Sequence, residues 1–222
     1  EFLQQAKIAG DEAEAQYLPV LERYDDGLLF YYFGNLDLIS HMMWHAMDPE
    51  HPAWDEEKWG VHRDVVRELY RTADRIVGQT LDAIDDDTTL IVMSDHGFAS
   101  WLRTVSLNAW LRDNGYLVLK NRNKKKASIL VDVDWARTRA YGIGLNGLYI
   151  NLRGREGKGI VDPAQKDALV DEIRSKLLAA IDPATGEPAI TKVYVTARDF
   201  EPGPHFDTGP DMVIGYAKGT RG

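Results

Sequence analysis

The sequence LIVMSDHGF at residues 90–98 is the part of the chain that most directly indicates its fold. An apolar run with β-branched residues leads without a break into Asp95 and His96, and Gly97 then permits a sharp turn of the backbone. This order predicts a buried strand that ends in a tight loop. Ligands of open α/β sheets bind beyond the carboxyl ends of the strands, so we expect a functional site at this loop.

A second stretch of the chain has the same layout. The apolar sequence GLLFYYF at residues 27–33 is followed by Asp37 and His41, which are four residues apart. In a helical turn, positions i and i+4 share one face, so both side chains can reach a single cation. Asp95 and His96 likewise combine a hard oxygen ligand with a borderline nitrogen ligand. Two strand ends that each carry Asp and His predict two metal ions rather than one.

The spacing of the apolar residues predicts a mixture of helices and strands. Residues 61–84 have the 3.6-residue period of an amphipathic helix. This helix would connect strands at 28–33 and 90–93 in a βαβ unit, whose strands are parallel. Further helices are expected at residues 1–22, 105–114 and 162–181, and further strands at 116–120, 135–152, 190–195 and 212–216.

The composition excludes several classes of protein. The 222 residues are 44% hydrophobic, which is enough for one sizeable core. The net charge of −9 argues against binding to duplex nucleic acid, although bound cations can reverse the local field for an anionic substrate. There is no cysteine, so any metal must rely on histidine and carboxylate ligands. No signal peptide or membrane-spanning run is visible, and neither compartment nor oligomeric state is indicated.

The pairing of an Asp-x-x-x-His element with a downstream Ser-Asp-His-Gly element resembles the alkaline phosphatase superfamily, in its type I phosphodiesterase and nucleotide pyrophosphatase family. Asp37 and His41 match the first element, and Asp95 and His96 match the second. The resemblance runs over nearly the whole chain from Asp26 onward. It is also carried by three longer stretches, residues 33–52, 146–155 and 209–216.

The resemblance implies a three-layer, alkaline-phosphatase-like core with a mostly parallel sheet flanked by helices. It implies a metal-dependent hydrolase of small phosphorylated substrates, acting on phosphodiester or nucleotide pyrophosphate bonds by a two-metal mechanism. Asp37 and His41 would hold one cation, and Asp95 and His96 the other. Zinc suits these ligands, and manganese or iron fits the same set. The family's Thr or Ser nucleophile should precede Glu1, so residues 1–222 are expected to form one partial catalytic domain that is inactive alone.

Within this domain, the metal-site segments are placed at residues 27–41 and 88–98, and an inserted subdomain at about 100–195. Other readings stay open. The same scaffold supports phosphatases, sulfatases and phosphomutases, and a non-catalytic metal-binding domain is a further alternative. His45, four residues beyond His41, is expected near the site or on the surface without touching the metal. His205 is the only late histidine, and either it or a residue beyond Gly222 would be the last ligand.

Overall fold

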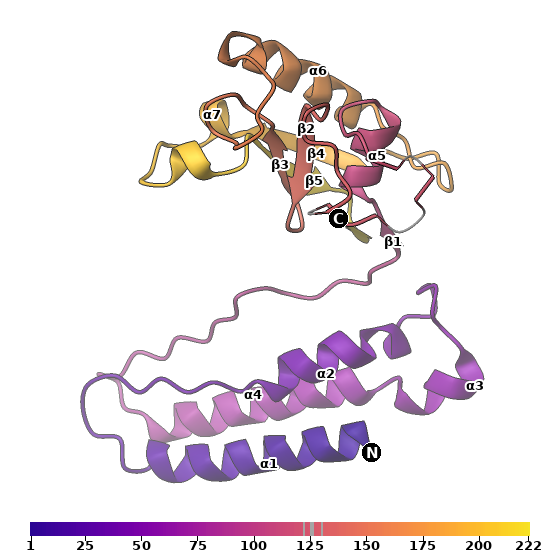
Figure 1. Ribbon diagram of the computed structural model, residues 1–222. Coiled ribbons are helices and arrows are strands. Elements are labelled where there is room, and N and C mark those ends of the chain that lie inside the picture. Colours follow the sequence, from indigo (N-terminus) through magenta and orange to yellow (C-terminus); the bar gives the residue numbers. More distant parts are fainter. Residues whose placement is uncertain (122, 125–126, 130) are drawn as a thin grey trace. The chain divides into compact units, whose positions relative to one another are not determined.

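The computed structural model describes residues 1–121, 123–124, 127–129 and 131–222. These residues form two compact units, 1–100 and 101–222, each with its own core (Figure 1). The boundary lies close to the expected start of an inserted subdomain, and the second unit continues to Gly222 instead of ending near residue 195. The assignment of both units to one catalytic domain stays a prediction.

The first unit is a layer of helices. The predicted helices at 1–22 and 61–84 are confirmed, although the second begins only at Val65 because a short turn of 3-10 helix precedes it. Ile39 and Met43 pack against Val66. This packing joins the helix that carries Asp37 and His41 to the long amphipathic helix. In the part of the chain that the structure describes, no helix combines the length and the apolar character needed to cross a membrane. The elements of this unit are α1 (Phe2–Leu21), α2 (Asn35–Met43), η1 (Trp44–Met47), α3 (Glu56–Trp59), η2 (Gly60–His62) and α4 (Val65–Ala83).

An aromatic cluster holds the segment before α2 against the helices. The ring centroids of Tyr17, Tyr31 and Phe33 lie 5.0–5.3 Å apart. The Tyr17 hydroxyl is hydrogen-bonded to the buried Thr80 hydroxyl at 2.8 Å, and Tyr31 donates to the Ala13 carbonyl at 2.8 Å. Aromatic rings that are buried while their hydroxyl groups stay hydrogen-bonded stabilise the packing around them. Tyr31 and Phe33 therefore form the face of this segment that packs against the helices.

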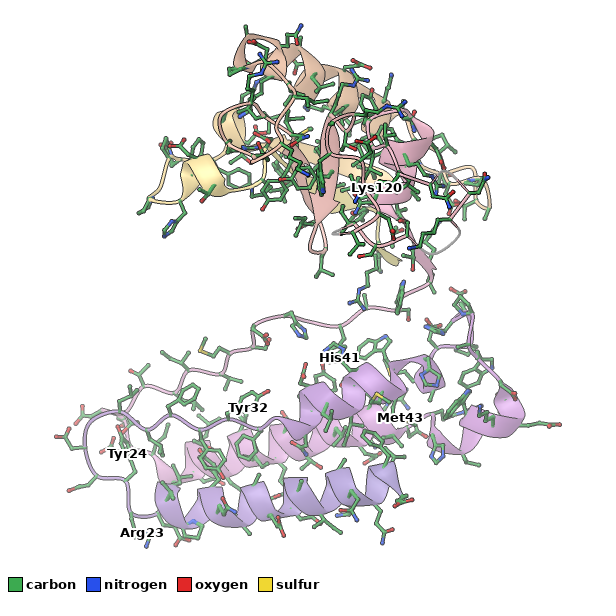
Figure 2. The ribbon with its side chains drawn as sticks, in the orientation of Figure 1. Arg23, Tyr24, Tyr32, His41, Met43 and Lys120 are labelled. Carbon is green, nitrogen blue, oxygen red and sulfur yellow. The ribbon has the colours of Figure 1, made fainter. Side chains whose placement is uncertain are left out.

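Residues 28–33 have an exposed outer face, and residues 91–93 are all exposed, contrary to the prediction of buried strands. Leu28 is 93% exposed and Met93 is 77% exposed, and Tyr32 lies on the exposed side as well (Figure 2). Neither segment is paired with a strand among the described residues, so both are extended chain rather than strands. A strand requires a neighbour for its backbone N–H and C=O groups, and apolar alternation alone does not supply one. The predicted βαβ unit is therefore not formed by the described residues.

The second unit is built on an antiparallel sheet of four strands in the order β2-β3-β5-β4. Strands were predicted over 135–152, 190–195 and 212–216, and these are confirmed, whereas residues 116–120 form only the single bridge Leu119–Val133. The chain is thus a mixed α/β protein, and a mostly parallel sheet is not confirmed. The strands are β1 (Arg103–Thr104), β2 (Ala140–Ile143), β3 (Gly147–Ile150), β4 (Ile190–Val195), β5 (Met212–Tyr216) and β6 (Thr220–Arg221), with β1 and β6 paired in parallel.

Helices cover this sheet and close its core. Ser106 caps the first of them by accepting a hydrogen bond from the Ala109 amide, and Gly115 follows its end at a φ of +75°, a conformation that favours glycine. Leu111 and Ile173, one on each of the two longer helices, are fully buried. The helices are α5 (Leu107–Asp113), η3 (Pro163–Gln165), α6 (Lys166–Leu178), α7 (Thr196–Asp199) and η4 (Phe206–Thr208).

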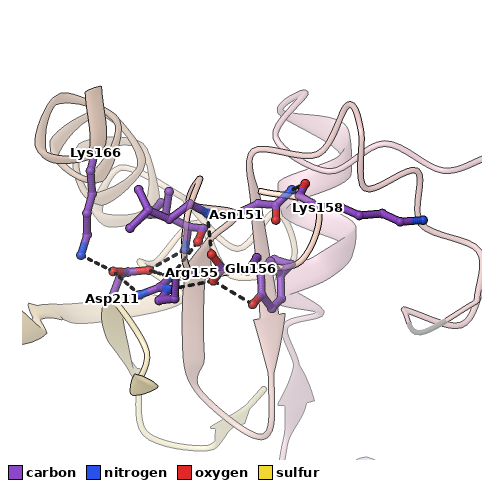
Figure 3. Close-up of polar contacts among 9 residues, drawn as sticks. Asn151, Arg155, Glu156, Lys158, Lys166 and Asp211 are labelled. Carbon is purple, nitrogen blue, oxygen red and sulfur yellow. Dashed lines mark hydrogen bonds and ion pairs between the residues drawn. The ribbon is translucent and has the colours of Figure 1, made fainter. Parts of the chain in front are cut away.

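A buried carboxylate ties the sheet to α6. The Asp211 side chain is only 2% exposed, and it accepts hydrogen bonds from Arg155 at 2.7 and 3.1 Å and from the Ile150 amide at 2.7 Å (Figure 3). Lys166 lies 2.6 Å from the same carboxylate. Burial by itself would raise the pKa of Asp211, but the hydrogen bonds from Arg155 and Lys166 outweigh it and lower the pKa. Asp211 is therefore a fully partnered anion in the core.

Replacing Asp211 by asparagine should strongly destabilise this unit. The change removes the carboxylate that pairs with Lys166 and one of the two carboxylates that pair with Arg155, which also contacts Glu156. Breaking a buried pair costs about 3–5 kcal/mol of unfolding free energy. Because the pKa of Asp211 is lowered in the folded state, its contribution is present above its ordinary pKa and is lost as the pH falls through the folded value. Urea unfolding followed by tryptophan fluorescence, at neutral pH and under acid, measures both effects.

The matched control is Asp171→Asn, which removes the carboxylate of the solvent-exposed ion pair with Arg198 in the same unit. Exposed pairs contribute little, so the urea midpoint should move much less. Equal destabilisation by the two variants would contradict the role assigned to Asp211.

Candidate metal centre

Two of the expected ligands lie on α2. The helix begins at Asn35, so Asp37 occupies its first turn and His41 follows one turn later. As the i, i+4 spacing predicts, both side chains share one face, and Nε2 of His41 lies 3.3 Å from Oδ1 of Asp37. Figure 2 shows His41 on this helix.

The third group comes from the loop after residues 90–93. Nε2 of His96 lies 3.5 Å from the same Oδ1 of Asp37. One ligand atom each from Asp37, His41 and His96 lie within 4.8 Å of one another. The Asp37 Oδ1 atom is buried and has no hydrogen-bond partner among the described residues. This buried carboxylate oxygen faces two imidazole nitrogens and receives no hydrogen bond from the described residues. One carboxylate and two imidazoles are a set of ligands that binds a divalent cation such as zinc.

A contact to the other ring nitrogen, Nδ1, fixes the orientation of the His96 ring. Nδ1 of His96 lies 3.1 Å from the carbonyl oxygen of Gly97. Because a carbonyl only accepts hydrogen bonds, Nδ1 carries the proton and the lone pair of Nε2 is directed toward Asp37 and His41. Such a contact to the outer nitrogen is the usual way in which proteins orient a metal-binding histidine.

The sequence of the chain also matches a known protein family over nearly its whole length. The model of the type I phosphodiesterase / nucleotide pyrophosphatase family matches residues 3–219, which is almost the entire chain. The chain belongs to this family. The match covers both compact units, and it assigns the protein to a class of hydrolases that act on small phosphorylated substrates. Neither the curated proteins nor the solved structures contain a match to the chain.

The other residue of the phosphodiesterase motif, Asp95, lies apart from the three clustered side chains. Its side chain is 90% exposed, and Oδ2 is 3.9 Å from Nε2 of His96. Nε2 of His96 thus lies closer to Asp37, at 3.5 Å, than to its sequence neighbour Asp95. The division of the four residues between two cations stays a prediction.

The remaining histidines of this family member have other surroundings. His45 packs edge-on against Trp59, with ring centroids 4.5 Å apart, and burial lowers its pKa, with smaller contributions from the neighbouring His51 and Lys58. This environment agrees with a position outside the metal ligands. His205 precedes η4 in the second unit and is exposed, and its role as a ligand stays a prediction.

Sequence reasoning missed one pair of residues beside the site. The Ser100 hydroxyl donates a hydrogen bond to the Asp48 carboxylate, 52 positions earlier in the chain. This bond, opposed by a weak effect of burial, lowers the pKa of Asp48. The Asp48-Pro-Glu sequence does signal a turn, and Asp48 also accepts from the Glu50 amide at 3.0 Å. Nothing in the sequence identifies Ser100 as its partner, because the contact depends on how the two loops meet.

The histidine contacts predict opposite tautomers for two rings. His96 donates from Nδ1 to Gly97, so it should be the Nδ1–H form when neutral. His51 accepts at Nδ1 from the Ala53 amide at 3.0 Å, so it should be the Nε2–H form. Long-range ¹H–¹⁵N correlation spectra of the metal-free protein, at a pH where both rings are neutral, distinguish these forms. The same tautomer in both rings would contradict the geometry, and His51 serves as the internal reference.

Proposed function

We propose that the protein hydrolyses phosphodiester or nucleotide pyrophosphate bonds with two divalent metal ions held by Asp37, His41, Asp95 and His96. The observation that carries this proposal is the meeting of the two Asp/His pairs: Nε2 of His96 lies 3.5 Å from the Asp37 Oδ1 atom, which has no hydrogen-bond partner among the described residues. Membership of the phosphodiesterase family supports the class of reaction. Zinc suits histidine and carboxylate ligands best, and manganese or iron accepts the same set.

Each ligand has a definite task in this proposal. Asp37 and His41, on one helical face, hold the first cation, and Asp95 with His96 holds the second. The two pairs are adjacent, because Nε2 of His96 lies 3.5 Å from Asp37 and 3.9 Å from Asp95, and the exposed Asp95 side chain would complete the second pair. When bound, the cations would supply charge stabilisation for the transferring phosphoryl group and activation of the attacking oxygen.

The protein residues around the ligands prepare the site for an anionic substrate. Gly97 keeps the proton of His96 on Nδ1, which leaves Nε2 free to bind a cation. The chain is acidic overall, so bound cations are what would attract a phosphate ester. The nucleophile of this proposal is a Thr or Ser outside residues 1–222, and residues 1–222 alone are expected to turn over little substrate.

The proposal extends to the fold. The two segments that lead to the ligands, residues 28–33 and 90–93, both end at the site, because His96 meets Asp37. Segments whose carboxyl ends converge on one site have the arrangement of neighbouring parallel strands. We therefore assign them to a parallel sheet of an alkaline-phosphatase-like, three-layer core, in which further strands would cover the exposed Leu28 and Met93.

Hydrogen exchange of the full-length protein tests the assignment of these strands. Backbone amides of residues 28–33 and 90–93 should exchange as slowly as those of β5, because ladder hydrogen bonds protect them. The loop at residues 201–205 provides the fast reference within the same molecule. Exchange of both segments at the rate of that loop would show that they are not paired.

Metal content and turnover of the full-length protein test the function. Elemental analysis should find close to two transition-metal ions per chain, and bis-p-nitrophenyl phosphate should be hydrolysed in preference to p-nitrophenyl phosphate. Preference for the monoester would instead indicate a phosphatase or phosphomutase. Absence of both metal and turnover would contradict the proposal.

Replacing His96 by alanine should abolish most of this activity. Loss of a group that merely supports a ligand costs about 10–100-fold, so loss of a ligand should lower kcat/KM by about 100-fold or more. His62→Ala is the matched control, because His62 lies in η2, outside the cluster of Asp37, His41 and His96. Equal activity of the two variants would show that His96 is not a ligand.

A further inference from the structure

The loop that carries His96 has little backbone support. Within the described residues, no backbone-to-backbone hydrogen bond involves residues 90–100, and none of them belongs to a helix or strand. The apolar residues before the loop are exposed, as Met93 shows. The position of the His96 ring must therefore depend on side-chain contacts made by the rest of this segment.

The first such contact is made by Phe98. Its ring lies edge-on to both imidazoles of the site, with centroids 4.8 Å from His41 and 5.3 Å from His96. Its face is stacked on Trp44, with centroids 5.3 Å apart and an interplanar angle of 21°. Trp44 directly follows α2, the helix of Asp37 and His41. Phe98 thus packs against both imidazoles, whose own centroids lie 5.5 Å apart, and attaches the loop to the residue that follows the helix of the other ligands.

The second contact is the hydrogen bond from Ser100 to Asp48. Asp48 directly follows η1, and its other carboxylate oxygen accepts from the Glu50 amide. The acceptor is therefore held in a turn at the end of the same helical region. The hydrogen bond from Ser100 is the main cause of the lowered pKa of Asp48, and a hydrogen bond to a charged carboxylate is stronger than one to a neutral acceptor.

We infer that Phe98 and Ser100 are positioning residues that hold His96 at the metal site by their contacts with Trp44 and Asp48. These four residues form a clasp between the loop and the end of α2. The clasp residues do not bind the cation themselves. They fix the distance between Nε2 of His96 and the ligands on α2, which a loop with no backbone-to-backbone hydrogen bond among the described residues cannot fix alone. The inference rests on the proposed metal-binding role of Asp37, His41 and His96.

Metal affinity of the full-length protein tests the clasp. Ser100→Ala and Phe98→Leu should each weaken the binding of Zn²⁺ and Co²⁺ by about 10–100-fold, the usual effect of losing a group that orients a ligand. The visible absorption spectrum of bound Co²⁺ should also change, because it reports the arrangement of the ligands. Ser100→Thr keeps the hydroxyl and should restore both the affinity and the spectrum.

Two further variants separate this role from a general loss of stability. Thr88→Ala is the matched control, because Thr88 donates a comparable hydrogen bond to Asp85 at 2.7 Å in the same unit. It should leave metal affinity and the Co²⁺ spectrum unchanged. Asp48→Asn can still accept from Glu50 and can donate to Ser100, so it should bind metal almost normally, whereas Asp48→Ala should resemble Ser100→Ala.

The outcomes distinguish the clasp from the metal site itself. If Ser100→Ala and Phe98→Leu bind both metals with normal affinity while His96→Ala does not, the clasp is wrong and the metal site stands. If His96→Ala also binds normally, the proposed site fails first. A spectrum altered equally by Thr88→Ala would overturn the clasp too. Circular dichroism and thermal unfolding establish that each variant is folded. If Ser100→Ala does not fold, Asp48→Ala provides the test in its place.

Discussion

The contact between the Asp37 carboxylate and the imidazoles of His41 and His96 is the interaction on which the site depends. An oxygen buried beside two ring nitrogens, with no donor to satisfy it, is costly in a folded protein unless a cation balances it. Regular helix geometry explains one half of this contact, since Asp37 and His41 are one turn apart on α2. The other half depends on a loop that makes no backbone-to-backbone hydrogen bond within the described part of the chain.

The two compact units meet different physical requirements. In the second unit, Asp211 is buried but receives hydrogen bonds from Arg155 and the Ile150 amide and an ion pair from Lys166, so its charge is fully balanced by the protein. In the first unit, Asp37 is partly buried and its charge is not balanced by any described donor. A carboxylate that the protein satisfies serves the fold, whereas one that it leaves unsatisfied is available to a ligand.

The extended segments before the two ligand loops connect the site to the fold of the family. Residues 28–33 have one face packed through Tyr31 and Phe33 and the other face open. This extended segment is therefore anchored by side chains on one side only. The ligands at its end are therefore held by the helices beneath, through the aromatic cluster and the packing of α2 on α4.

The sequence by itself determined the helices at 1–22 and 61–84, the strands at 190–195 and 212–216, and the family, because apolar periodicity and the spacing of Asp and His are local properties. It also predicted that Asp37 and His41 share a helical face. The described residues do not form buried strands at 28–33 and 90–93, because the apolar pattern does not determine whether a neighbouring strand is present. Only the tertiary structure decided that His96 lies closer to Asp37 than to Asp95, and that Ser100 is hydrogen-bonded to Asp48. Those contacts join residues more than 50 positions apart, and the packing of one loop on a helix, rather than any spacing in the chain, sets their distances.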